Sequence, residues 1–185
     1  MKIAIDPGHG MGNITANVYD PGATMTSAGF FFEEASIALR HSHVLRTALL
    51  AMGTEPVFLS REDRDDQAPL TQRAPSAKLV GAQVLVSIHC NSHTVATANG
   101  IEVLYRTAAS KSLAQTVQTA LVNATGLTNR GIKVRSELAV LKFDGPAILI
   151  ELGFISNTTD RASLIHPGKR HMACEAIAKA LLGPW

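Results

Sequence analysis

The fold of this chain is decided by the stretch Val84-Leu85-Val86-Ser87-Ile88-His89, an almost continuous apolar run that ends in a histidine. Such a run is typical of a strand that is buried on both faces, in the middle of a parallel sheet. A second run of the same kind is Ala147-Ile148-Leu149-Ile150-Glu151-Leu152. We therefore expect two central strands, at Gln83–His89 and Ala147–Leu152.

The rest of the chain alternates between short apolar runs and segments with helical periodicity. Further strands are expected at Lys2–Asp6, Pro56–Ser60, Ile101–Arg106 and Leu138–Lys142. Helices are expected at Glu34–Met52, Leu70–Val80, Lys111–Thr125, Thr158–Ile165 and Lys169–Leu182. This alternation predicts a single α/β domain over residues 1–185, with a mostly parallel, twisted central sheet of about six strands and helices on both faces.

The composition fits one compact domain with a hydrophobic core. The chain has 185 residues, of which 46% are hydrophobic and 17% are charged, too few charges for a disordered chain. Its formal net charge of +2 is too small to indicate binding to nucleic acid. Cys90 and Cys174 make no disulfide framework, and without a C-x-x-C pair they do not indicate a thiolate zinc site.

The N-terminal sequence is not typical of a signal peptide, because Asp6 and the glycines after it interrupt any apolar region. No stretch approaches the roughly 20 apolar residues that are needed to cross a bilayer. We therefore expect no export signal in this chain and no insertion into a membrane. Either the chain is made in the cytoplasm and released by another route, or it was cut from a longer precursor.

Chemically active side chains follow three of the predicted strands. His9 follows the first strand, His89 ends the third, and Glu151 lies near the end of the last one. Catalytic groups of open parallel sheets gather outside the carboxyl ends of the strands, so these three side chains are expected to share one site. The irregular stretch from Pro7 to Phe32 also fits a functional role, because long loops in compact domains are usually functional.

Two histidines and a carboxylate are the usual ligands of a catalytic zinc, which keeps a fourth position open for water. His9 and His89 supply two ligands, and the third is Glu151 or another acid. Glu33 and Glu34 are candidates at the start of the first predicted helix, where the helix dipole favours a carboxylate. The chain has no H-E-x-x-H sequence, so the common helical zinc-protease site is absent.

Four segments resemble, in the same order, those of the zinc-dependent N-acetylmuramoyl-L-alanine amidases, and the match covers nearly the whole chain. They are Ile3-Ala4-Ile5-Asp6-Pro7-Gly8-His9-Gly10, Glu34 at the start of its helix, Val86-Ser87-Ile88-His89-Cys90-Asn91-Ser92, and the segment from Pro146 to Asn157 around Ile150-Glu151-Leu152-Gly153. Leu59-Ser60-Arg61 and Leu70 with Arg73 also fit this family.

The resemblance implies a zinc ion held by His9, Glu34 and His89, with Glu151 as the general base. Glu34 is preferred to Glu33 by its distance from Gly53, which ends the predicted helix. The implied substrate is peptidoglycan or a muramyl peptide, cut at the amide between N-acetylmuramic acid and L-alanine. The implied place of action is the cell wall, either as a released lysin or as the catalytic part of a secreted protein. We expect a monomer that works without an activator.

Several alternatives stay open on the sequence. The chain could be a zinc peptidase or deacylase acting on another amide, or a non-catalytic module that binds the cell wall. Asp6 could be a turn residue or could orient His9. The run Phe30-Phe31-Phe32 could pack at the edge of a loop or line the substrate groove. Cys90 is expected to be a small buried residue rather than a nucleophile.

Overall fold

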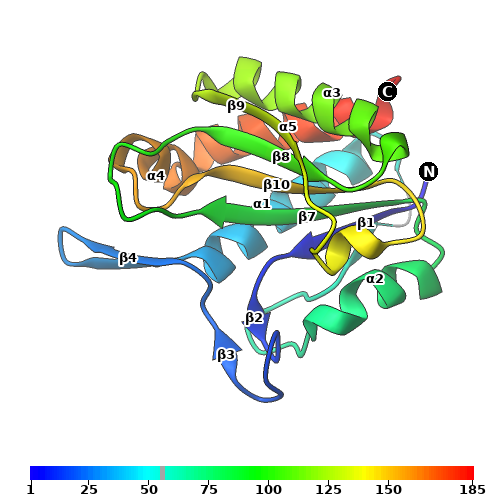
Figure 1. Ribbon diagram of the computed structural model, residues 1–185, viewed down its shortest axis with the longest axis horizontal. Coiled ribbons are helices and arrows are strands. Elements are labelled where there is room, and N and C mark those ends of the chain that lie inside the picture. The colour runs from blue at the N-terminus through cyan, green and yellow to red at the C-terminus, as the bar shows by residue number, and fades with distance from the viewer. Residues whose placement is uncertain (55–56) are drawn as a thin grey trace.

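The computed structural model describes residues 1–54 and 57–185, and its centre is one six-stranded sheet with the strand order β6-β1-β7-β10-β8-β9 (Figure 1). The strands of this sheet are β1 (Ile3–Pro7), β6 (Val57–Leu59), β7 (Val84–Asn91), β8 (Ile101–Tyr105), β9 (Asn129–Val134) and β10 (Ala147–Phe154). The helices are α1 (Glu34–Ala51), α2 (Leu70–Leu79), α3 (Ala108–Thr125), α4 (Thr158–Ile165), α5 (Pro167–Leu182) and the 3₁₀ helix η1 (Val140–Lys142).

The two apolar runs form the middle of the sheet, as predicted. Strand β7 pairs in parallel with β1 on one side and with β10 on the other, so these three strands end at the same edge. Strand β8 is antiparallel to β10, and the outer strands β6 and β9 are each parallel to their neighbour. The sheet is therefore mostly parallel.

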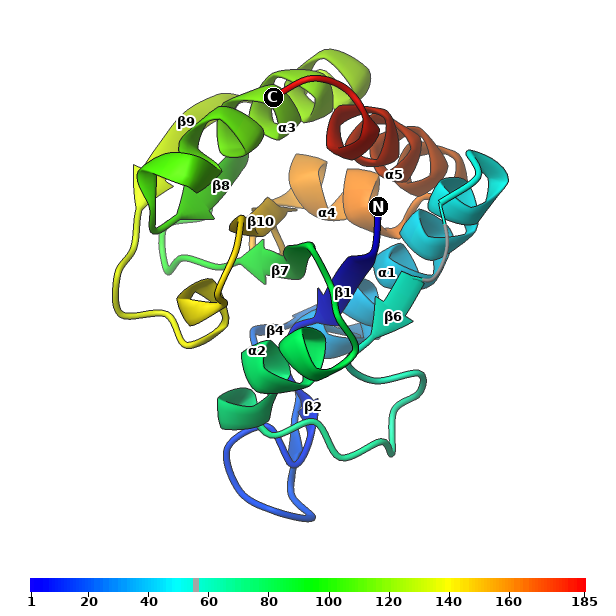
Figure 2. The same ribbon diagram turned by 90° about the vertical axis from the view of Figure 1, so that its right-hand side faces the viewer.

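Helices cover both faces of the sheet (Figure 2). On one face, α1, α3 and α5 pack on alternate strand residues such as Val86 and Ile150. On the other face, α2 and η1 pack on the intervening residues of the same strands, such as Leu85 and Leu149. This arrangement confirms the predicted fold class, an α/β domain with about six mostly parallel strands and helices on both faces.

The prediction of a strand at Leu138–Lys142 is wrong, because this segment contains the 3₁₀ helix η1. Its buried residues Val140 and Leu141 pack against α2 and the sheet face. A short apolar run has the same composition in a buried strand and in a buried helical turn, so periodicity does not separate the two.

The sixth strand of the sheet is β9, which the sequence does not predict. Its residues are exposed or half-buried, and Gly131 lies inside it with a φ of 75°. An edge strand of this kind lacks the apolar alternation that marks a half-buried strand. Of the second predicted strand, Pro56–Ser60, the residue Pro56 lies outside the described residues, and β6 begins at Val57.

The stretch from Pro7 to Phe32 contains four short strands instead of being irregular throughout. Strands β2 (Gly10–Met11) and β3 (Tyr19–Asp20) pair with each other, and β4 (Thr24–Ser27) pairs with β5 (Phe30–Glu33). Both pairs are antiparallel. Among the described residues, no helix is both long and apolar enough to span a membrane.

Candidate functional site

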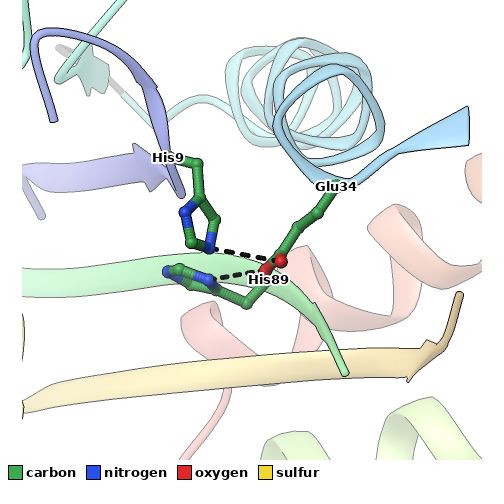
Figure 3. A group of neighbouring side chains, drawn as sticks. All are labelled: His9, Glu34 and His89. Carbon is green, nitrogen blue, oxygen red and sulfur yellow. Dashed lines mark hydrogen bonds and ion pairs between the residues drawn. The ribbon is translucent and has the colours of Figure 1, made fainter. Parts of the chain in front are cut away.

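The carboxyl edge of the sheet brings together His9, Glu34 and His89 (Figure 3). His9 follows β1, His89 lies near the end of β7, and Glu34 is the first residue of α1. One ligand atom from each of the three residues lies within 4.8 Å of the others. Because β1 and β7 are parallel neighbours, their ends place the two histidines side by side.

The carboxylate of Glu34 lies between the two imidazole rings. Its Oε2 is 3.2 Å from Nε2 of His9, and its Oε1 is 2.8 Å from Nδ1 of His89. Backbone N–H groups of Ala23 and Cys90 also donate to this carboxylate, at 2.9 and 3.0 Å. Burial alone would raise the pKa of Glu34, but the hydrogen bonds and charges of the histidines hold it well below its usual range. Glu34 is therefore an ionised group that faces two potential metal ligands.

Glu33 lies apart from this group, although it is the neighbour of Glu34 in sequence. Its Oε1 accepts hydrogen bonds from Tyr19 and Ser36 and pairs with Arg64, 2.7 Å away. The start of α1 therefore directs the two carboxylates to different places, and only Glu34 reaches the histidines.

His9 has a strained backbone, with a φ of 58° in the left-handed region. The residue before it must be a glycine, because a Cβ on Gly8 would lie 2.3 Å from Cε1 of His89. The close approach of Gly8 to this ring lets the two imidazole rings pack edge to face, with centroids 5.1 Å apart and an interplanar angle of 74°.

Two buried arginines hold the loop that carries His9. Arg73 donates to the carbonyl oxygens of Pro7 and His9, both at 2.7 Å. Arg61 donates to the carbonyl oxygens of Pro7 at 3.1 Å and Gly8 at 2.8 Å. These bonds give the carbonyl groups of the loop charged donors as partners, and they stabilise the left-handed turn at His9.

Asp6 does not orient His9. It accepts hydrogen bonds from Arg73 at 2.6 Å, Ser60 at 2.5 Å and Ser87 at 2.6 Å. Burial would raise the pKa of Asp6, but the Arg73 charge and the two hydroxyl groups lower it. Asp6 therefore anchors Arg73 in the interior.

The residue that orients His9 is Asp20, which the sequence does not single out. Its Oδ2 lies 2.8 Å from Nδ1 of His9, and the amide of Asn13 donates to the same oxygen. This contact leaves Nε2 of His9 directed at Glu34. Burial would lower the pKa of His9, but Glu34 and Asp20 outweigh it and raise the pKa to about 9. A carboxylate on the outer nitrogen of a histidine is a common support of metal sites.

Glu151 lies in β10, beside His89 in the register of the sheet. Its Oε2 is buried and has no hydrogen-bond partner among the described residues. Desolvation raises the pKa of Glu151 to about 7, with Glu34 and Glu102 adding to the rise and His89 opposing it. A carboxyl group with a pKa near neutrality can both accept and donate a proton.

A cavity of about 220 Å³ lies beside the histidines. Its polar lining includes His9, His89 and Asp20, and its apolar lining includes Leu70, Val140 and Leu149. The cavity gives a small substrate group access to the candidate centre. Cys90 is buried, and burial raises the pKa of its thiol well above the ordinary value, which disfavours the thiolate form that a nucleophile needs.

The donor set fits a zinc ion. Two imidazoles and one ionised carboxylate lie close enough to share an ion, one histidine is oriented by Asp20, and a cavity adjoins the group. Three such ligands with one open position are the usual arrangement of a catalytic zinc site.

Comparison with known proteins identifies the family. The family model Amidase_3, described as N-acetylmuramoyl-L-alanine amidase, matches residues 3–182. The curated N-acetylmuramoyl-L-alanine amidase LytC of Bacillus subtilis (strain 168) is 31% identical over 95% of this chain and 34% of its own length. The probable cell wall amidase LytH of Staphylococcus epidermidis is 29% identical over 97% of this chain and 56% of its own length. The chain therefore spans about a third to a little over half of these relatives.

Two solved structures have the same fold over nearly their whole length. The catalytic domain of CwlV, an N-acetylmuramoyl-L-alanine amidase from Bacillus (Paenibacillus) polymyxa var. colistinus, has a TM-score of 0.85 at 30% identity, over 97% of this chain and 95% of that one. The N-acetylmuramoyl-L-alanine amidase from Clostridium difficile 630 has a TM-score of 0.84 at 34% identity, over 98% and 94%.

Proposed function

Because the chain belongs to the N-acetylmuramoyl-L-alanine amidase family, we propose that it is a zinc-dependent hydrolase of peptidoglycan. The bond that it cuts joins the lactyl group of N-acetylmuramic acid to the amino group of L-alanine. The observation that carries this proposal is the buried Oε2 of Glu151, which has no partner within residues 1–54 and 57–185 and whose residue lies beside His89 of the candidate metal centre. A buried carboxylate without a partner is costly, which indicates a functional reason for its presence.

His9, Glu34 and His89 would hold the zinc ion. When bound, zinc would supply an activated water and would polarise the scissile carbonyl. Asp20 keeps the ring of His9 in the orientation that binds metal, and Arg61 and Arg73 keep its backbone in place. The chain thus provides a prearranged set of ligands.

Glu151 acts as the proton carrier in this proposal. It accepts a proton from the attacking water and passes it to the leaving nitrogen, so the products are a free lactyl carboxylate and a free L-alanine amine. The apolar neighbours Ile150 and Leu152 are buried, which keeps the carboxyl group in a dry wall of the site. This environment supports proton transfer in both directions, because it raises the pKa of Glu151 to about 7.

The test is product analysis with the purified chain and purified peptidoglycan. The expected products are new L-alanine amines in equal number to new lactyl carboxylates, with loss of activity on chelation and recovery on addition of zinc. New amines from other residues would identify a peptidase. Binding to the wall without any product would identify a non-catalytic module.

We also propose that the chain acts on the cell wall as a monomer.

A further inference from the structure

The hairpin of β4 and β5 carries an exposed aromatic surface. Phe30 and Phe31 are 68% and 63% exposed, on the strand that runs directly into α1. The turn at Ala28 and Gly29, both with positive φ, ends just before them. Exposing two neighbouring phenylalanines to water is costly, and exposed apolar patches often mark binding sites.

A groove lies beside this hairpin, and we call it the hairpin groove. Its walls are the run Phe30–Phe32 on one side, Ile37 and Arg40 of α1 on another, and Ile165 at the end of α4. Its volume is about 380 Å³. This size lies in the range of sites for small ligands or for a few units of a polymer.

The hairpin groove contains a positive charge that no residue in the described part of the chain neutralises. Arg40 is exposed, and among the described residues its side chain has no hydrogen-bond or ion-pair partner. Arg64 also lines the groove, but it is paired with Glu33 and lies over the ring of Tyr19. The guanidinium of Arg40 is therefore available to a carboxylate of a ligand.

The hairpin is braced against the body of the protein. The buried Arg161 of α4 donates to Ser27 in the hairpin at 3.1 Å and to the carbonyl oxygen of Ile155 at 3.0 Å. The same guanidinium lies 5.5 Å from the centre of the ring of Phe32. These contacts hold the aromatic wall in place before any ligand arrives, which lowers the entropy cost of binding.

Both ends of the hairpin meet the candidate metal centre. At its start, the N–H group of Ala23 donates to Glu34, and at its end Glu33 precedes Glu34 in sequence. In Figure 1 the hairpin projects beyond the edge of the sheet at which the arrow of β7 ends. Glu33 lines the hairpin groove and directly precedes Glu34, so the groove reaches the start of α1, where Glu34 of the candidate metal centre lies.

We propose that the hairpin groove is a second subsite for the peptidoglycan polymer whose amide is cut at the metal centre, and this inference rests on the proposed function. The apolar faces of sugar rings would pack on Phe30 and Phe31, and a carboxylate of a peptide stem would pair with Arg40. The volume of about 380 Å³ suits a few units of a polymer, and the exposed Arg40 matches the carboxylates of peptide stems, so a segment of the polymer fits this groove.

The experiment compares polymer and fragment. The variants are Phe30→Ala with Phe31→Ala, Phe30→Tyr with Phe31→Tyr, and Arg40→Ala. The matched control is Leu79→Ala in α2, because Leu79 is 88% exposed and lies outside the groove. Binding to insoluble peptidoglycan is measured by sedimentation of the zinc-loaded protein, with Glu151→Gln added to each variant to prevent digestion. Turnover without that change is measured on intact peptidoglycan and on a soluble muramyl dipeptide.

The double alanine variant should bind the polymer about tenfold more weakly, which is a loss of about 1.4 kcal/mol. Its turnover on the dipeptide should stay within a factor of about two of the wild-type value, because so small a substrate gains little from a second subsite. The tyrosine variant should keep most of the binding. Arg40→Ala should weaken binding at low salt and make it less sensitive to salt, because exposed charges are screened. Leu79→Ala should change nothing.

Unchanged binding of the polymer by the alanine and Arg40→Ala variants would overturn the proposal, and so would equal losses of turnover on polymer and dipeptide. A wild-type dimer that the alanine variant dissociates would show that a second copy of the chain occupies the groove. If the wild-type chain binds peptidoglycan through the groove but releases no product, the proposed function fails while the subsite stands. If the alanine variant does not fold, Arg40→Ala still decides the question, because the proposal predicts weaker binding for it.

Discussion

The geometry of the candidate site depends on a few buried polar residues. His9 is held from three directions, through Asp20 on its ring, Glu34 on the other nitrogen and Arg73 on its carbonyl oxygen. A residue with a φ of 58° persists only when its surroundings determine its conformation. These contacts therefore position Nε2 of His9. Losing one of them should weaken metal binding more than it lowers the stability of the fold.

Replacing Asp20 by Asn should weaken zinc binding by about 10- to 100-fold, the usual effect of losing such a support. Asparagine keeps the size of the side chain but removes the negative charge beside Nδ1 of His9. The measurement is the zinc dissociation constant by competition with a chelator, and the control is Asp65→Asn, an exposed residue away from the site. Unaltered zinc affinity with an intact fold would mean that Asp20 does not support the ligand.

At the scale of residues, the sequence predicts the members of the site that follow strands. His9 and His89 lie at the ends of neighbouring parallel strands, so the topology alone brings them together. Asp20 could not be predicted in the same way, because it reaches His9 only after the stretch from Pro7 to Phe32 folds back as β2 and β3. Its single signal is that it is an acid in a long segment before the first helix.

At the scale of elements, α1 joins the site to the core. Its first residue, Glu34, faces the histidines, and about two turns later His41 lies fully inside the protein. Nδ1 of His41 is bonded to the carbonyl oxygen of Ile37 at 2.9 Å, and the charge of Arg170 in α5 lies near it. Desolvation, with the Arg170 charge adding to it, lowers the pKa of His41 to about 4.

His41 should make the stability of the protein depend on pH. Its pKa falls from 6.5 in the unfolded chain to about 4 in the folded one, so the unfolded state binds more protons between these values. The contribution of His41 is complete above pH 6.5 and is lost as the pH falls towards 4. The full effect is about 3 kcal/mol, at 1.36 kcal/mol for each pKa unit.

The measurement is the free energy of unfolding of wild type and His41→Gln across this pH range. The wild-type value should fall more steeply, because glutamine takes up no proton. His171→Gln, at an exposed position of α5, is the control and should follow the wild type. Parallel curves for wild type and His41→Gln would contradict the prediction. Loss of metal at acid pH should affect all three proteins equally, so it does not change the difference between their curves.

At the same scale, the sequence predicts the number of strands in the sheet correctly but assigns one of them to the wrong segment. Leu138–Lys142 has the apolar composition of a strand but forms η1, because it packs on α2 instead of pairing with a neighbour. β9 takes its place in the sheet with residues that are exposed or half-buried. Backbone hydrogen bonds to β8 hold β9 at the edge of the sheet, and a pattern of side chains does not predict such pairing.

At the scale of the whole molecule, the site lies open beside a cavity. Between His89 and Glu151 the chain forms β8, α3, β9 and η1, and α3 packs on α5 on the face away from α2 and η1. Of these elements only the three-residue η1 lines the cavity, and its residues Val140 and Leu141 are buried in the core against α2, so it is part of the wall of the site and not a helix inserted across it.

The purified chain should therefore hydrolyse purified peptidoglycan without a second protein. The measurement is the release of L-alanine amines over time by the zinc-loaded chain alone. The control is the same protein after chelation, which should release none. Activity that begins only when another protein is added would contradict this prediction and would indicate a site that needs rearrangement.

The assignment of Glu151 as general base is tested most directly by the variant Glu151→Gln. Glutamine is nearly the same size, so the end of β10 should keep its packing, but it cannot accept the proton of water. Turnover on muramyl peptides should fall by about 10²–10⁴-fold or more, while substrate binding changes little. Zinc content and the midpoint of thermal unfolding should stay at the wild-type values. Near-normal turnover would contradict the role, and loss of zinc together with activity would make Glu151 a metal ligand in place of Glu34.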